Sequence, residues 1–185
     1  MRFTKPFSAA ALLALLLSGC AGSPPQQASE DTDTGAFNAV LPAGEPTPNP
    51  YTRGPHPRVN ADTRRQFESA KQAMHRGDWP QAEQLLNAIT ESQPNLSGAW
   101  LNLGIVWRKL GQDDKARAAF EQSTVANPNH IAAYNHLGLL LREQGDFAGA
   151  EAAYSQALAV WPFDVSTHRN LGILYDLYLG QWPQA

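Results

Sequence analysis

The sequence predicts an all-α fold, a solenoid of stacked helix pairs, from two observations on its periodicity. The first is a pattern of a large residue, Leu-Gly three positions later, and a second large residue three positions beyond the Gly. It occurs at Trp100, Leu103, Gly104 and Trp107, returns after 34 residues at Tyr134, Leu137, Gly138 and Leu141, and returns again at His168, Leu171, Gly172 and Tyr175. Recurrence at a fixed interval of this length is typical of repeat architectures.

The second observation concerns the rest of the repeating unit. Gly111, Ala116, Phe120 and Pro128 recur as Gly145, Ala150, Tyr154 and Pro162, and they are preceded by Gly77, Ala82, Leu86 and Pro94. In these positions the chain resembles the tetratricopeptide repeat (TPR) family, which implies a helix-turn-helix solenoid. The resemblance divides an array of residues 61–185 into three full repeats, 63–96, 97–130 and 131–164, and a partial fourth, 165–185.

The chemistry of these positions favours the same fold. Residues 99–110 and 116–125 are two apolar runs at helical spacing. Gly111 between them can take the left-handed conformation that ends a helix, and Pro128 stops the second run. Small Gly104 and Ala116 allow the two helices to approach closely. A single pair cannot bury its own apolar face, so neighbouring repeats must stack.

The first 19 residues predict a signal peptide, because basic Arg2 and Lys5 precede a short apolar run, residues 9–17. The run Leu17-Ser18-Gly19-Cys20 resembles the lipobox of bacterial lipoproteins, which implies cleavage before Cys20 and lipidation of that residue by acyl chains such as palmitate. Cys20 is the single cysteine, so no internal disulfide can form. Ala21 in the next position implies the outer membrane of a Gram-negative cell, with the chain facing the periplasm.

Residues 20–60 predict a disordered, lipid-anchored tether, since eight prolines stand among small polar residues. Its apolar residues Phe37, Val40, Leu41 and Tyr51 could instead dock on a partner. Loss of Arg2 and Lys5 on cleavage would lower the formal charge from −3 to −5. No basic stripe then remains for a phosphate backbone, which argues against nucleic acid as a partner.

The two ends of the array depart from the repeat pattern. Asp62 is a candidate N-cap for a polar first helix that resembles the solvent-facing cap of a solenoid. In repeat four, eight positions separate Gly172 from Gly180, whereas seven separate the equivalent glycines before it. The extra residue predicts either a wide helical turn or a register shift at the turn. The second helix of this repeat is missing, so we expect an apolar surface at Leu171, Leu174, Tyr175 and Tyr178 that frays, self-associates or belongs to a longer protein.

Catalytic motifs are absent from the sequence. There is no His-Glu-x-x-His, Gly-x-Ser-x-Gly or phosphate-binding Gly loop, and no two histidines share a helix face at metal-ligand spacing. We therefore predict a protein that is not an enzyme and that uses no cofactor or metal.

The resemblance also implies a concave groove lined by the first helix of each repeat. The matching positions are Leu101, Asn102, Ile105, Arg108 and Lys109 in repeat two, Asn135, His136, Leu139 and Arg142 in repeat three, and Arg169, Asn170 and Ile173 in repeat four. Amides suit a peptide backbone, Leu and Ile suit apolar side chains, and Arg or Lys suits a carboxylate. His136 stands where a carboxylate-binding groove would carry Asn, so the set is incomplete for a C-terminal carboxylate.

These features predict a scaffold or adaptor that binds another envelope protein through the groove. The resemblance suggests assembly of an envelope machine, namely a type IV pilus or secretion channel, polysaccharide export or peptidoglycan remodelling. Two alternatives are an enzyme or small-ligand protein, which only His136 near Arg142 and Arg169 would favour, and a structural spacer between membrane and wall.

Overall fold

The computed structural model describes residues 45–54 and 57–180, which lie within a compact unit spanning residues 35–185. The predicted signal peptide, Cys20, most of the predicted tether and residues 181–185 lie outside the described residues.

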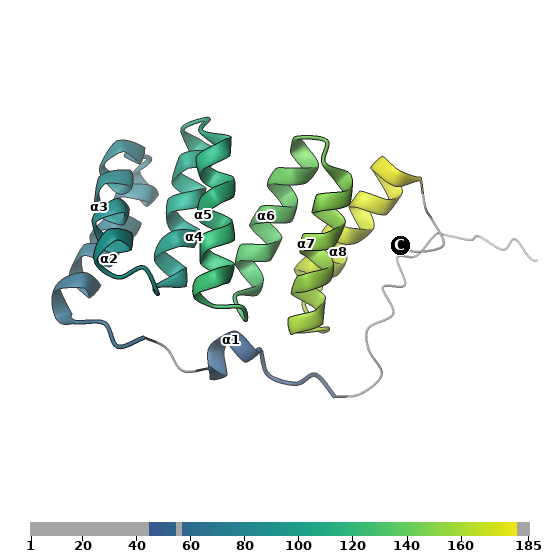
Figure 1. Ribbon diagram of the computed structural model, residues 1–185, viewed down its shortest axis with the longest axis horizontal. Coiled ribbons are helices and arrows are strands. Elements are labelled where there is room, and N and C mark those ends of the chain that lie inside the picture. The colour runs from purple at the N-terminus through teal and green to yellow at the C-terminus, as the bar shows by residue number, and fades with distance from the viewer. Residues whose placement is uncertain (1–44, 55–56, 181–185) are drawn as a thin grey trace, which may run out of the picture. The chain divides into compact units, whose positions relative to one another are not determined.

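The described residues form eight α-helices followed by one π-helix, and they contain no strand. The α-helices are α1 (Pro50–Arg53), α2 (Ala61–Arg76), α3 (Trp79–Ser92), α4 (Ser97–Lys109), α5 (Asp113–Ala126), α6 (Ile131–Glu143), α7 (Phe147–Val160) and α8 (Val165–Leu174), and the π-helix is η1 (Tyr175–Leu179). Helix α2 pairs with α3, α4 with α5 and α6 with α7, while α8 packs on α7 (Figure 1). This arrangement confirms the predicted all-α solenoid of helix pairs.

The pairs α4–α5 and α6–α7 each have a glycine at the turn and a glycine at the crossing. Gly111 has a φ of 71°, in the left-handed region, and its N–H donates to the carbonyl of Arg108 at the end of α4. At the crossing, a Cβ added to Gly104 would lie 2.5 Å from the ring of Phe120, which no real side chain tolerates. Both positions therefore carry the residue that the predicted close approach requires.

The core runs continuously from one repeat to the next. One buried cluster joins α2, α3 and α4, a second joins Ala116 and Phe120 of α5 to Leu140 of α6, and a third joins Tyr154 of α7 to Leu174 of α8. Since each cluster takes residues from neighbouring repeats, the repeats stabilise one another as a solenoid requires.

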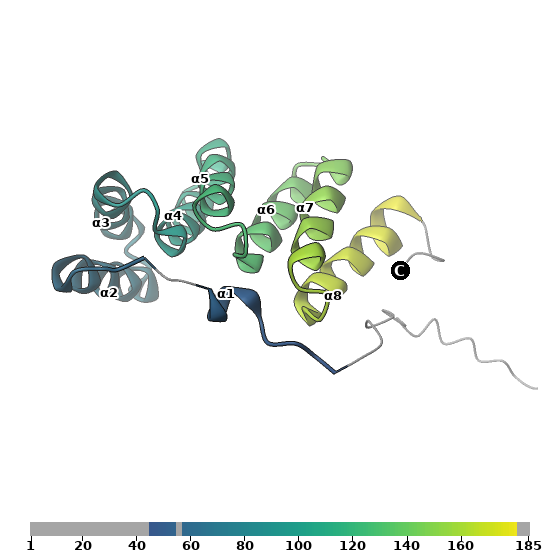
Figure 2. The ribbon, with the colours of Figure 1, turned by 60° about the horizontal axis from the view of Figure 1, so that its bottom comes forward.

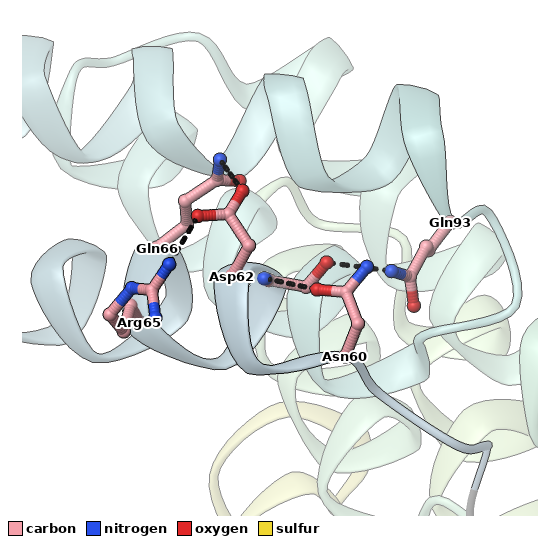
Figure 3. Close-up of polar contacts among 6 residues, drawn as sticks. Asn60, Asp62, Arg65, Gln66 and Gln93 are labelled. Carbon is pink, nitrogen blue, oxygen red and sulfur yellow. Dashed lines mark hydrogen bonds and ion pairs between the residues drawn. The ribbon is translucent and has the colours of Figure 1, made fainter.

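The start of α2 differs from the prediction that Asp62 is its N-cap. Asn60 is the N-cap, and its Oδ1 accepts a hydrogen bond from the backbone N–H of Thr63 at 2.7 Å (Figure 3). Asp62 lies in the first turn, where its carboxylate accepts from Arg65 and Gln66. Asn60 takes this role because its extended backbone, with ψ of 166°, turns the side chain back over the first amides.

The extra residue of repeat four lies in the π-helix η1, so the wide helical turn is the alternative that the structure supports. Leu174 is fully buried and Tyr175 is 8 % exposed, so the predicted uncovered surface is wrong for these two residues. Tyr175 packs towards α7 and donates from its hydroxyl to Oε1 of Glu151 at 2.7 Å. Among the described side chains of η1, the exposed apolar ones are Leu177 and Tyr178.

Residues 45–54, within the range predicted to be disordered, carry the short helix α1 and contact the array. The ring of Tyr51 stacks on the ring of His130, and the backbone carbonyl of Thr47 accepts a hydrogen bond from Nε1 of Trp161. Tyr51 therefore contacts the array of its own chain, whereas the sequence-based alternative would place it on a partner.

Candidate functional site

The first helices of the repeats lie next to one another and form a common face. Helix α4 contacts α6, and α6 contacts α8, in addition to the contacts within each pair (Figure 2). The predicted groove residues of three repeats are thereby brought together. We call the surface of α4, α6 and α8 that carries them the first-helix face.

Most predicted residues on this face are half-buried, and only Lys109 and Arg169 are exposed. The half-buried ones are Leu101, Asn102, Ile105, Arg108, Asn135, His136, Leu139, Arg142, Asn170 and Ile173. Leu101 and Ile105 pack against the cluster of Phe120 and Leu140. These two side chains therefore serve the core as well as the face.

The predicted peptide-binding amides are partly engaged inside the protein. Nδ2 of Asn135 donates to Oγ1 of Thr167 at 2.8 Å and to Oδ2 of Asp164 at 3.2 Å, and its Oδ1 accepts from Asn170 at 3.3 Å. Asn135 has therefore used both amide hydrogens to hold α6 to the start of α8. Asn102 donates to the carbonyl of Gly98 within its own helix at 2.7 Å. Asn102 and Asn170 each keep a second N–H and a carbonyl oxygen that have no partner among the described residues.

Four polar atoms of α6 and the adjoining α7 are buried without hydrogen-bond partners among the described residues. They are Nε and Nη1 of Arg142, Nδ1 of His136 and the hydroxyl of Tyr154. Tyr154 is fully buried, and the ring of His136 stacks on Phe120 with centroids 5.4 Å apart. A buried N–H or O–H without a partner costs about 1 to 3 kcal/mol, and more when the group is charged. Such atoms are expected to find a partner in water or in a bound ligand.

Two arginines on this face have different surroundings. Arg108 on α4 forms an ion pair with both carboxylate oxygens of Glu143 on α6. Arg142 has no ion pair among the described residues, and its guanidinium carbon lies 5.8 Å from the ring centroid of Tyr178. The positive charge of Arg142 is therefore balanced only by an aromatic ring.

Burial keeps the neighbouring titratable groups neutral. Burial lowers the pKa of His136, and the positive charge of Arg108 lowers it further. Burial raises the pKa of Tyr154, Arg142 opposes that rise, Glu143 adds to it and Arg108 opposes it. At neutral pH the group thus offers one cation, a phenol donor and a neutral imidazole, which suits an anionic oxygen group such as a carboxylate.

Neither Tyr154 nor the neighbouring Glu143 was identified as a site residue from the sequence. Tyr154 stands where the other full repeats have Phe120 and Leu86, so the hydroxyl at an otherwise apolar position was the available signal. Glu143 directly follows Arg142 at the end of the first helix, and no sequence pattern indicated that it pairs with Arg108.

Neither a metal site nor a membrane-spanning helix has a candidate in the described part of the chain. Residues 45–54 and 57–180 contain no group of three His, Cys, Asp or Glu side chains that could hold a metal ion. Their helices are all too short or too polar to cross a membrane. Cys20, the predicted lipidation site, lies outside the described residues.

The helix pairs and their continuous core define a helical-repeat protein, and part of the sequence matches a known repeat family. Residues 95–162 match the tetratricopeptide repeat family. No curated protein matches the sequence significantly.

Several solved structures are similar to this chain. The Sgt2 TPR domain from Aspergillus fumigatus is 21 % identical with a TM-score of 0.61, over 71 % of this chain and 89 % of that one. The Yersinia enterocolitica type III secretion chaperone SycD, in complex with a peptide of the translocator YopD, is 18 % identical with a TM-score of 0.61, over 66 % and 97 %. The first TPR of Spaghetti (RPAP3), bound to the HSP90 peptide SRMEEVD, is 14 % identical with a TM-score of 0.60, over 65 % and 97 %. At these identities the similarity establishes the fold, which is that of a TPR solenoid.

Proposed function

We propose that this chain is a scaffold that binds a segment of another protein on its first-helix face. The observation that carries the proposal is the guanidinium of Arg142 in the last turn of α6, which is buried at two nitrogens and has no acceptor for them among the described residues. A carboxylate from a partner would supply the missing acceptor. The SycD and RPAP3 structures, each with a peptide bound, support this use of the fold.

The rest of the face has the chemistry to hold such a segment. Leu139 of α6 and Ile173 of α8 offer half-buried apolar side chains on the same face. Asn102 and Asn170 retain amide groups for a peptide backbone, whereas Asn135 is committed to the contact between repeats. Recognition would therefore combine backbone hydrogen bonds, apolar contacts and one charged contact.

The location of the scaffold is the second part of the proposal. The Leu17-Ser18-Gly19-Cys20 run supports lipidation at Cys20 and anchoring in the outer membrane, with the array in the periplasm. The partner is then another envelope protein, in pilus or secretion-channel assembly, polysaccharide export or peptidoglycan remodelling. Substituting Cys20→Ala tests the anchor, and unchanged outer-membrane fractionation of the variant would contradict it.

Binding is tested by recovery of partners from detergent-solubilised envelopes with three forms of the full chain. The Arg142→Gln variant removes the charge from the face. The Arg117→Gln variant is the matched control, because Arg117 lies exposed on α5 and pairs only with Glu121 of the same helix. A charged hydrogen bond contributes about 1.5 to 3 kcal/mol, so we expect Arg142→Gln to weaken binding about 10- to 100-fold and the control to bind normally. Equal recovery by all three forms would refute the role of the face.

A further inference from the structure

Residues 45–54, which we call the arm, contact the array through a ring stack and a hydrogen bond, among other contacts. The ring of Tyr51 stacks on that of His130 at the start of α6, with centroids 4.2 Å apart and planes at 11°. Nε1 of Trp161, at the end of α7, donates to the carbonyl of Thr47 at 2.7 Å. The arm therefore contacts the array at the N-cap of α6 and at the C-cap of α7.

Local contacts within the arm restrain its backbone in the conformation that makes this contact. Asn49 is the N-cap of α1, and its Oδ1 accepts from the backbone N–H of Tyr51 at 2.9 Å. Pro50 fixes the backbone at the first position of the turn. The hydroxyl of Thr52 donates to the carbonyl of Asn49 at 2.8 Å. These local restraints present the Tyr51 ring in one orientation, which lowers the entropy lost on docking.

The receptor for Tyr51 is a neutral histidine held by the repeat core. The hydroxyl of Ser123 donates to the carbonyl of Ser97 at 2.8 Å, so the Ser123 oxygen is available to accept from Nδ1–H of His130 at 3.0 Å. Burial, together with the smaller effect of His136, lowers the pKa of His130 to about 4. His130 is thus an uncharged, immobile ring on which an aromatic side chain can stack.

The arm also borders two hollows at the beginning of the first helices. One, of about 930 Å³, lies between Tyr51 of the arm, Phe67 of α2 and Leu96 before α4. The other, of about 280 Å³, lies between Asn49, Asp164 and the face residues Asn135 and His136. The arm therefore covers one end of the surface on which a partner segment would lie.

We propose that the arm is the resident ligand of this end of the first-helix face, and that a partner segment of the same chemistry must displace it. That chemistry is an extended, proline-containing segment with one aromatic side chain for His130, as in Thr47-Pro48-Asn49-Pro50-Tyr51. The displacement by a partner rests on the proposed function, whereas the binding of the arm does not. Because the arm is covalently attached, its local concentration is on the order of millimolar, and weak contacts suffice to keep the site filled.

The test uses a fluorescent synthetic peptide of residues 45–54 and the full chain in detergent. Tyr51→Ala in the protein vacates the His130 ring without altering the array. Arg53→Ala is the control, since Arg53 is an exposed arm residue with no contact to the array in the structure. We expect the peptide to bind the Tyr51→Ala chain at least about tenfold more tightly than the wild-type and Arg53→Ala chains, in which the arm competes. A peptide that carries Ala in place of Tyr51 should not bind.

Three outcomes would overturn the proposal. The first is equal binding of the peptide to all three chains, and the second is binding to none of them. The third is a wild-type dimer that Tyr51→Ala converts to monomer, because the arm would then bind a second copy of the chain. The test requires no partner protein, so it is separate from the test of the proposed function. If the peptide binds as expected while Arg142→Gln leaves partner recovery unchanged, the arm inference stands and the role of the face fails.

Discussion

Gly138 of α6 lies so close to Tyr154 of α7 that a Cβ on the glycine would be 2.6 Å from Cε1 of the tyrosine ring. We therefore predict that Gly138→Ala lowers the free energy of unfolding by about 1 to 3 kcal/mol, because the ring is fully buried and cannot move aside. Chemical denaturation measures the effect.

Gly98→Ala is the control for this prediction. Gly98 also lies in a first helix, but a Cβ there would meet its nearest neighbour, the Tyr51 hydroxyl, at 3.8 Å, an ordinary contact. Ala is the better helix former by roughly 1 kcal/mol, so Gly98→Ala should leave stability unchanged or raise it. A Gly138→Ala variant as stable as Gly98→Ala would show that the crossing tolerates a wider separation.

Removing the Tyr154 hydroxyl should stabilise the free protein. The hydroxyl is buried without a partner among the described residues, and Phe120 shows that a phenyl ring fits the equivalent position of repeat two. We expect Tyr154→Phe to raise the free energy of unfolding by roughly 1 kcal/mol, since an unsatisfied buried donor is lost and the packing is kept.

The same substitution should weaken partner binding if the phenol donates a hydrogen bond to the partner's carboxylate. The combination of higher stability and lower affinity distinguishes a ligand-binding hydroxyl from a structural one. Lower stability of Tyr154→Phe would indicate that the hydroxyl already has a partner such as a buried water.

The fold was predictable because the residue pairs that pack together recur with the period of the repeat. Gly104 and Gly138 stand opposite Phe120 and Tyr154, and each small and large pair returns with the period of the unit. The positive φ of Gly111 and Gly145 also followed from their places between two apolar runs. Periodicity therefore specified both the helices and their closest contacts.

The functional details were less predictable because they depend on contacts between distant residues. The pattern treats Tyr154 as equivalent to Phe120, since both fill the same volume, and it carries no information on the hydroxyl. Asn135 is a predicted groove residue, but its amide bonds to Thr167 of α8 and to Asp164, the N-cap of α8. Tyr51 belongs to no repeat, so nothing periodic pointed to His130 as its contact.

Asn135→Ala should loosen the contact between repeats three and four. It removes two hydrogen bonds donated to α8 and its cap, and it leaves the buried Thr167 with one acceptor site unfilled. We expect a loss of about 1 to 2 kcal/mol in the free energy of unfolding and faster hydrogen exchange across α8. Asn102→Ala is the control, because its amide bonds only within α4, and it should leave exchange in α8 unchanged. Unchanged hydrogen exchange across α8 in Asn135→Ala would mean that Asn135 does not hold the two repeats together and is available to a partner.

Stability should fall in mild acid because His130 is held neutral in the folded chain. Its pKa is about 4 in the fold against an ordinary value of 6.5, so the unfolded chain takes up the proton first as the pH drops. The contribution of His130 is therefore fully present above about pH 6.5 and is lost as the pH falls from there to about 4. A shift of this size corresponds to on the order of 3 kcal/mol, and His136, whose pKa is lowered in the same direction, adds to the effect.

Denaturation midpoints between pH 7 and pH 4 measure this loss, and His130→Asn should flatten the profile. Asn keeps a side-chain donor that can reach Ser123 but has no group that gains a proton in this range. The variant should be less stable than wild type at pH 7, because it loses the stack with Tyr51, yet it should lose less stability on acidification. His75→Asn, an exposed position at the end of α2, is the matched control and should retain the wild-type slope. A His130→Asn profile parallel to wild type would mean that carboxylates, rather than this buried imidazole, govern the acid response.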